Sequence, residues 1–300
     1  MKKIIRELLN QKSFYQVLKD YELDKYELLS EMSGEMYAYD STVTSTEKEI
    51  LENIYKREAS MFNLTDEKVM FISDTHMASE REELTYFKEV LHFCKDNNIQ
   101  YLIHAGDIAD GTVLVQIGEE QIKKNIAFSE IKQNTVDAQV KSILDNYLTT
   151  PEVVQFVLGG NHDERYLERD IDILKLLAKQ KNIVPLGYLQ AFFTIYGYPI
   201  SLEHGSRNIY SLSAVPNLFP QSIKIKGHSH IWLLENNKIY LPTLSKDIKY
   251  EKGASGLPGF IVMNSSKTGN ILTLKFERFY YIEDNLYLDQ KPYVLQRKIN

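Results

Sequence analysis

The sequence of 300 residues contains a single cysteine, Cys94. One thiol cannot form an internal disulfide, and so little cysteine is typical of a reducing compartment, so we expect a cytoplasmic protein. No apolar run approaches the roughly 20 residues that span a bilayer. The first apolar stretch is interrupted at once by Arg6 and Glu7. The sequence therefore predicts neither a membrane segment nor a signal peptide.

The sequence also lacks an excess of positive charge. It holds 35 Lys and Arg against 41 Asp and Glu, which gives a net charge of −6. The overall charge therefore offers no basic footprint for nucleic acid. Bound divalent cations would add positive charge that such a count omits, so a metal-centred site for phosphate groups stays open.

Residues 1–65 carry apolar residues at helical spacing and no strand alternation, which predicts a helical segment. Ser13 is a candidate N-cap and Gly34 a candidate stop, so two short helices around a turn at 20–24 are expected, a spacing like that of a helix-turn-helix. Acidic residues outnumber basic ones in this region, which makes it a poor surface for a phosphate backbone. We expect the segment to pack on the rest of the protein or on a second subunit, with DNA reading as the alternative.

From about residue 66 to residue 300 the pattern changes to strands alternating with helices. The short apolar runs "KVMFISD", "IQYLIHAGD" and "VVQFVLGGN" each end in a polar residue, and a long helical pattern covers 113–148. Such strand–helix–strand units predict a buried parallel or mixed sheet. After residue 190 the sequence turns to hairpins, with turns at Gly197-Tyr198 and Asn236-Asn237. We therefore expect an α/β fold with two sheets face to face and helices outside. The tail from residue 276 onward is expected to add an edge strand or a dimer contact.

Side chains that can bind metal follow the ends of these strands, in order. The blocks are "SDTH" with Asp74 and His76, "GDIAD" with Asp107 and Asp110, "GGNHDE" with Asn161, His162 and Asp163, "LEHGS" with His204, and "KGHSH" with His228 and His230. Five of the seven histidines lie in these blocks. One such block occurs by chance in many chains, but five after strand-like runs indicate a site at the carboxyl ends of the strands.

The residue types indicate the chemistry of that site. A mixed Asp, His and Asn shell suits divalent ions such as Mn, Fe or Zn. A carboxylate can bridge two cations, and Asp107 stands between the other blocks. Two ions ~3.5–4 Å apart can hold a hydroxide and clamp the attacking and leaving oxygens of a displacement at phosphorus. His162 is then available to act on the leaving group or on the equatorial oxygens.

The series Asp-x-His, Gly-Asp-x-x-Asp, Gly-Asn-His-Asp, His-Gly and Gly-His-x-His resembles the calcineurin-like metallophosphoesterases over about residues 68–265. With its N-terminal helical segment, the chain is similar to phage and prokaryotic members. The resemblance implies a four-layer α-β-β-α sandwich of two mixed sheets and a centre of two divalent ions, with Mn expected and Fe or Zn as alternatives. By matching position, one ion takes Asp74, His76 and His230, the other takes Asn161, His204 and His228, Asp107 bridges them, and His162 is the catalytic histidine.

Further residues have expectations of their own. Many relatives carry an arginine where this chain has Gly111, so a phosphate contact is expected from Arg165 or Arg207. His104 is expected to be buried and hydrogen-bonded and not to be a ligand. Lys224 and Lys226 alternate with apolar neighbours, so we expect them on a solvent-exposed face.

The leading hypothesis is a hydrolase that acts on a phosphodiester of a nucleic acid or a nucleotide. A phosphomonoesterase or a phosphoprotein phosphatase would use the same ions. A non-catalytic nucleic-acid-binding protein is a further alternative, against which the intact set of ligand blocks argues. The state of association stays open, with a homo-oligomer among the alternatives.

Overall fold

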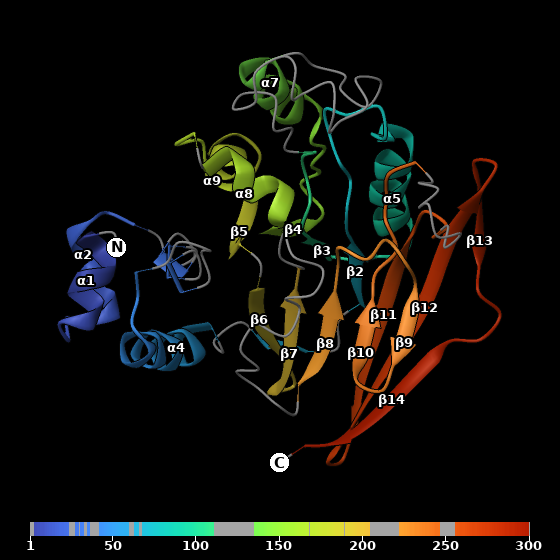
Figure 1. The fold of residues 1–300 in the computed structure, drawn as a ribbon. Coiled ribbons are helices and arrows are strands. Elements are labelled where there is room, and N and C mark those ends of the chain that lie inside the picture. The colour runs from blue at the N-terminus through green and yellow to red at the C-terminus, as the bar shows by residue number, and fades with distance from the viewer. Residues whose placement is uncertain are drawn as a thin grey trace.

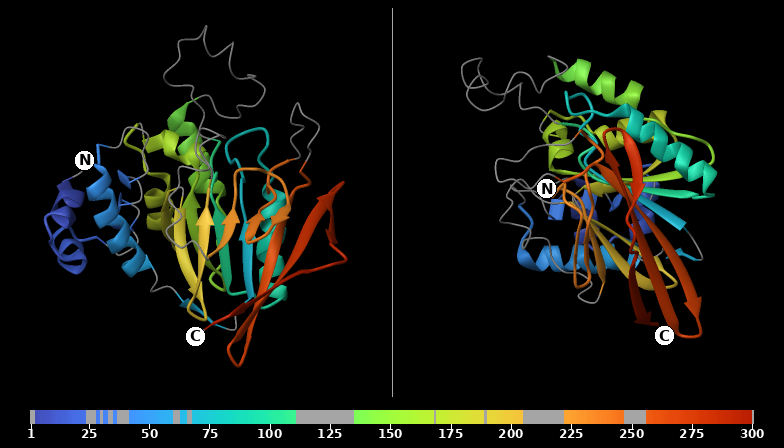
Figure 2. Two further views of the ribbon diagram at one scale, coloured as in Figure 1. Left: turned by 60° about the horizontal axis from the view of Figure 1, so that its bottom comes forward. Right: turned by 90° about the vertical axis from the view of Figure 1, so that its right-hand side faces the viewer.

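The computed structural model describes residues 3–23, 28–29, 31–32, 35–36, 42–59, 63–65, 68–110, 135–167, 169–188, 190–204, 222–246 and 256–299. In this part of the chain, two mixed sheets pack face to face and helices lie on their outer sides (Figure 1 and Figure 2). The predicted four-layer sandwich is therefore confirmed.

The larger sheet has eight strands in the order β13-β12-β11-β2-β3-β4-β5, with β14 also paired to β12. Its strands are β2 (Lys68–Ile72), β3 (Tyr101–Ala105), β4 (Val154–Gly159), β5 (Ile183–Tyr188), β11 (Gly259–Thr268), β12 (Ile271–Ile282), β13 (Asn285–Leu288) and β14 (Tyr293–Lys298). The pairs β2–β3, β3–β4 and β4–β5 are parallel, and β11 joins β2 antiparallel. Because helices cover one face and the second sheet the other, the central strands are almost continuously apolar.

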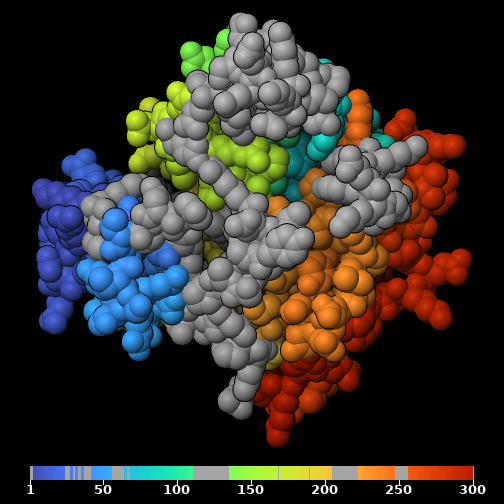
Figure 3. Space-filling view, in the orientation of Figure 1, coloured from blue at the N-terminus to red at the C-terminus, as the bar shows by residue number. Residues whose placement is uncertain are grey.

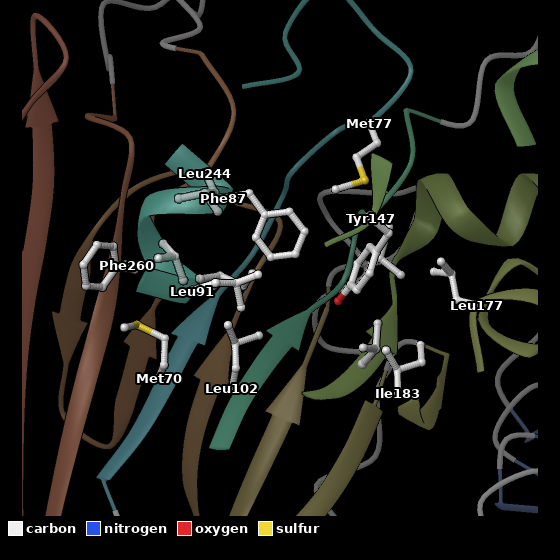
Figure 4. Close-up of a cluster of buried hydrophobic side chains, with 14 of the residues drawn as sticks. Met70, Met77, Phe87, Leu91, Leu102, Tyr147, Leu177, Ile183, Leu244 and Phe260 are labelled. Carbon is white, nitrogen blue, oxygen red and sulfur yellow. The ribbon is translucent and has the colours of Figure 1, made fainter. Parts of the chain in front are cut away.

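Four helices cover the outer face of this sheet: α5 (Leu84–Asp96), α7 (Val136–Asn146), α8 (Asn161–Leu167) and α9 (Ile173–Gln180). Phe87 and Leu91, one helical turn apart on α5, lie against Met70 of β2 and Leu102 of β3 in one buried cluster (Figure 4). The helical pattern expected over 113–148 is borne out from Val136 to Asn146, and its part before residue 135 lies outside the described residues.

The smaller sheet has the order β1-β6-β7-β8-β10-β9. Its strands are β1 (Asn63–Leu64), β6 (Gln190–Ile195), β7 (Tyr198–Glu203), β8 (Ile223–Lys226), β9 (Leu233–Glu235) and β10 (Lys238–Tyr240). The β6–β7 and β9–β10 pairs are antiparallel hairpins, as predicted, whereas β7 and β8 are parallel. Phe193 and Ile225 point into the core between the two sheets, with Phe71 and Ile103 of the larger sheet.

The N-terminal helices α1 (Lys3–Leu9), α2 (Phe14–Asp20) and α4 (Ser45–Ala59) lie beside the β6 end of the smaller sheet (Figure 1). They share an apolar cluster with Phe192, which points outward from β6, and the hydroxyl of Tyr55 donates to the carbonyl of Gln190 at 3.2 Å. Ser13 caps α2 by accepting from the backbone N–H of Gln16, as predicted. The expected second helix of the helix-turn-helix lies partly outside the described residues.

The C-terminal tail forms strands β13 and β14, which both pair with β12 at the edge of the larger sheet. The prediction of an added edge strand is therefore confirmed. These strands and the N-terminal helices lie on opposite sides of the molecule (Figure 3). Among the described helices, none is long and apolar enough to cross a membrane.

Candidate metal centre

The five sequence blocks meet at one edge of the sandwich. Asp74 and His76 follow β2, Asp107 follows β3, Asn161 follows β4, His204 follows β7, and His228 and His230 follow β8. The carboxyl ends of parallel strands lie at the same edge of a sheet, so strand order alone brings the blocks together. All seven candidate ligands are buried except His228, which is half-buried.

Asp74, His76 and His230 form the first cluster of donor atoms. The Oδ1 atom of Asp74 lies 3.0 Å from Nε2 of His230 and 3.8 Å from Nε2 of His76. The two imidazole Nε2 atoms are 3.1 Å apart. Three donor atoms therefore converge on one small volume, as one cation would require.

Asp107, His204 and His228 form the second cluster. The Nε2 atom of His204 lies 3.1 Å from Oδ2 of Asp107 and 4.0 Å from Oδ1 of Asp74, so the two clusters are adjacent. The other nitrogen of His204, Nδ1, donates to the carbonyl of Ala105 at 2.6 Å, which leaves Nε2 facing the carboxylates. Six of the seven predicted ligands thus lie in two adjacent clusters, and Asp107, the predicted bridge, belongs to the second cluster.

Several buried polar atoms at the centre make no well-aligned hydrogen bond within the described part of the chain. Oδ1 of Asn161 is one of them, and Oδ1 of Asp74, Nδ1 of His76 and Nε2 of His204 face only other candidate groups of the centre, at 3.0 Å, 3.5 Å and 3.1 Å. A buried polar atom without a hydrogen bond costs about 1–3 kcal/mol, so such groups are rare unless they serve a ligand. Carboxylate, amide and imidazole donors of this kind fit two borderline divalent cations.

The buried charges compensate one another within the centre. Burial alone would raise the pKa of the Asp74 and Asp107 carboxyls, but the histidines beside them hold both pKa values below the usual range. Burial alone would lower the pKa of His204, yet Asp107 and Asp74 raise it to about 10. Without a cation, a proton on His204 therefore offsets part of the negative charge of these two carboxylates.

Five of the candidate ligands adopt left-handed backbone conformations. The φ angles are +55° at Asp74, +44° at His76, +53° at Asp107, +70° at His228 and +56° at His230. Such conformations cost roughly 1–3 kcal/mol each in residues other than glycine and cluster at functional sites. Long-range hydrogen bonds support them: the N–H of Asp74 donates to Gly106, and that of His228 to the Asp74 carboxylate.

Glycines allow the loops to approach this closely. A Cβ on Gly160 would lie 2.2 Å from Oδ1 of Asp107, and one on Gly227 would lie 2.3 Å from Oγ of Ser73. Because neither space admits a side chain, the glycines of the "GGN" and "KGH" blocks are required by packing around the centre.

His162 lies at the open side of the centre, with 23% of its side chain exposed. Its Nδ1 donates to the carbonyl of Asp110, and its Nε2 is 3.9 Å from Oδ2 of Asp107. Burial lowers the pKa of His162 to about 4, so the imidazole is neutral at pH 7. Nη1 of Arg165 is 3.3 Å from Nδ1 of His162, whereas Arg207 lies outside the described residues.

Asp110 lies between two of these histidines. Its Oδ1 is 3.5 Å from Nδ1 of His76 and 3.8 Å from Nδ1 of His162. His104 is buried, accepts from the N–H of Gly106 at 3.3 Å, and contacts the hydroxyl of Thr75 at 3.1 Å through Nε2. The expectation of a buried, hydrogen-bonded His104 is confirmed.

The expectation that Lys224 and Lys226 face solvent is wrong. Lys226 is 7% exposed, and its Nζ is 2.9 Å from the carboxylate of Glu203, which is 4% exposed. Lys224 contacts the same carboxylate at 3.1 Å. The two lysines do lie on the face of the sheet opposite Ile225, but Lys226 is covered there, and Glu203 on the neighbouring strand forms ion pairs with both.

Comparisons with known proteins complete the description. A model of the family described as calcineurin-like phosphoesterase matches residues 67–257. Among solved structures, a Vps29 mutant from Entamoeba histolytica is 13% identical with a TM-score of 0.40, and the match covers 77% of this chain and 99% of that chain. Vps29 from Cryptosporidium parvum is 15% identical with a TM-score of 0.39, over 77% of this chain and 98% of that chain. The search of curated proteins gave no match.

Proposed function

Because the chain belongs to the calcineurin-like phosphoesterase family, we propose that it is a metal-dependent hydrolase of phosphodiesters, with a nucleotide or a nucleic acid as its substrate class. The observation that carries the proposal is the presence of two adjacent clusters of mostly buried donor atoms, one with Asp74 and one with Asp107. Two divalent ions bound there, with Mn as the expected metal, would polarise the phosphoryl group and lower the pKa of water.

Each side chain has a part in this proposal. Asp74, His76 and His230 would hold one ion, and Asn161, His204 and His228 the other. Asp107 would serve both, because its carboxylate faces His204 and lies next to the Asp74 cluster. Asp110 would orient the imidazole of His76, whose Nδ1 is 3.5 Å from its carboxylate.

His162 would act on the leaving group. Its Nε2 faces the centre, while its Nδ1 is held by the carbonyl of Asp110. Burial keeps the pKa of His162 low in the free protein, but a phosphoester anion beside the ring would raise it. The imidazole could then carry a proton to the leaving oxygen.

Arg165 supports a diester substrate. Its guanidinium lies beside His162 and is suited to a charge-assisted hydrogen bond with a non-bridging phosphate oxygen. Within the described residues, Arg165 is the arginine that lies beside His162. A diester carries one negative charge and a monoester two, so a diester needs fewer cationic partners. The same ions would also serve a phosphomonoesterase or a phosphoprotein phosphatase, so substrate choice must be measured.

The test compares substrates that share a leaving group. Metal-free protein is reconstituted with Mn(II), Fe(II) or Zn(II) and assayed with bis(p-nitrophenyl) phosphate, p-nitrophenyl phosphate and a phosphopeptide. We expect metal-dependent turnover that favours the diester. His162→Ala should lower this turnover ~10²–10⁴-fold at unchanged metal content, whereas the exposed His92→Ala is the matched control and should have no effect. Faster monoester turnover would refute the diester assignment, and no turnover with any metal would refute the hydrolase.

A further inference from the structure

Asp163 connects two of the loops that carry the centre. Its carboxylate is fully buried and accepts three backbone hydrogen bonds. Oδ2 accepts from Gly160 at 2.8 Å and from Ile108 at 3.1 Å, and Oδ1 accepts from Ala109 at 2.9 Å. Ile108 and Ala109 directly follow Asp107 in the sequence, and Gly160 directly precedes Asn161. One side chain therefore holds the loop after β3 to the loop after β4.

Asp107 makes the reciprocal connection, from the loop after β3 to the loop after β4. Oδ1 of Asp107 accepts from the backbone N–H of His162 at 2.9 Å, so each loop supplies a carboxylate to the backbone of the other. Gly160 packs against Asp107 so closely that a Cβ would lie 2.4 Å from the Asp107 nitrogen. Three hydrogen bonds and one close packing contact thus join the two loops, all of them between protein atoms.

Helix capping alone does not account for Asp163. The helix α8 (Asn161–Leu167) is 7 residues long, and only Gly160 directly precedes it, whereas the donors Ile108 and Ala109 belong to the loop after β3. Asp163 also differs from the candidate ligands, because among the described residues it belongs to none of the groups whose donor atoms converge. Its oxygens are directed at backbone amides.

We propose that Asp163 is a positioning residue that holds Asp107 and the Asn161–His162 loop in their binding geometry before any ion enters. Asp107 has a left-handed φ of +53°, a conformation that surrounding contacts must maintain. Three backbone N–H groups from the two loops donate to the oxygens of Asp163, so this clasp suits that purpose. The inference rests on the proposed function and extends it to a residue that contacts neither ion nor substrate.

The first test uses Asp163→Asn, which keeps the shape of the side chain but turns an N–H₂ donor toward backbone N–H donors. Titration of metal-free protein with Mn(II) should show the affinity of the more weakly bound ion lowered ~10–100-fold, the range typical of groups that orient metal ligands. Electron paramagnetic resonance at two equivalents of Mn(II) should change from the spectrum of a coupled ion pair to that of isolated ions. Wild-type affinity and coupling in the folded variant would overturn the proposal.

The control is Asp172→Asn. Asp172 caps α9 by accepting from the N–H of Lys175 at 3.0 Å and also accepts from the hydroxyl of Tyr188 at 2.8 Å, so it is a comparable hydrogen-bonded carboxylate. Because asparagine caps a helix as well as aspartate does, this variant should stay folded while Mn(II) affinity and the coupled spectrum stay unchanged. An equal loss of Mn(II) affinity in both variants would reduce Asp163 to a general structural role and overturn the proposal.

A second measurement needs no variant, in case Asp163→Asn does not fold. Hydrogen exchange on the metal-free wild-type protein should find the amides of Ile108 and Ala109 protected, because the clasp forms without ions. Exchange at these two amides that becomes slow only after Mn(II) is added would overturn the proposal. None of these readouts depends on phosphoester turnover, so a failure of the clasp and a failure of the proposed function are distinguishable.

Discussion

Entry of a cation at the second cluster should expel a proton from His204. Nε2 of His204 is 3.1 Å from the Asp107 carboxylate and 4.0 Å from that of Asp74, and the side chain is buried. Burial alone would lower the pKa of His204, but the two carboxylates raise it to about 10. Nε2 cannot bind a cation while it carries a proton, so at pH 8 the proton must leave as the ion enters.

The magnitude follows from the pKa of about 10. One pH unit corresponds to about 1.4 kcal/mol, so displacing this proton at pH 8 costs about 3 kcal/mol of binding free energy. Because the protonated form is favoured below the raised pKa, the affinity for the second ion should rise about tenfold per pH unit between pH 7 and pH 9. By the same linkage, the proton on His204 stabilises the metal-free fold below the ordinary histidine pKa, and this stabilisation is lost as the pH rises through about 10.

The assay is calorimetric titration of metal-free protein with Mn(II) at pH 8, in two buffers that differ in ionisation enthalpy. The buffer dependence should reveal release of at least one proton per chain. The exposed His92→Gln should release the same number, and His204→Gln should release one fewer while it weakens the second ion. Uptake of two ions without proton release, at an affinity that does not change between pH 7 and pH 9, would refute a charged His204–Asp107 pair.

Three further predictions concern the bridge, a buried ion pair and the N-terminal helices. Asp107→Asn should lower the affinity for both ions together, because its carboxylate serves both clusters; elemental analysis after reconstitution with Mn(II) would contradict this if a single ion were lost. Glu203→Gln should lower the free energy of unfolding in urea by about 3–5 kcal/mol, since it leaves Lys226 buried without its counter-charge. The double variant Glu203→Gln/Lys226→Met should lose less than the sum of the single variants, and strict additivity would rule out coupling. Phe192→Ala should cost about 3–5 kcal/mol by opening a cavity under the N-terminal helices, and an unchanged melting temperature would show that these helices do not pack on β6.

The fold could be predicted because its signals are local. Runs of apolar residues such as "KVMFI" mark buried strands. The four-residue spacing of Phe87 and Leu91, about one helical turn, marks a helix that covers them. The hairpin turns were also correct, because their turn residues occur at fixed positions between strands. The approximate position of the centre followed from the same signals, since polar residues at the ends of parallel strands share one edge.

Other features could not be predicted, because they depend on partners distant in the sequence. Lys224 and Lys226 alternate with apolar residues as an exposed strand face would, but Lys226 is buried on that face and both lysines pair with Glu203 on the neighbouring strand. The stretch before residue 63 showed only helical spacing, and its docking on Phe192 is a property of the folded sheet. A local sequence pattern does not specify which distant residue will lie opposite it in the folded protein.

By itself, the sequence determined which donor atoms this protein has and which strand each donor residue follows. The tertiary structure decided how those donors face one another: the left-handed φ angles of five candidate ligands, the 3.1 Å approach of His204 to the Asp107 carboxylate, and the hydrogen bond from Ile108 to Asp163, 55 residues away. The physical reason is that residue type and spacing set local conformation and chemistry. Strain, charge compensation and hydrogen bonds between loops exist only after long-range contacts have formed.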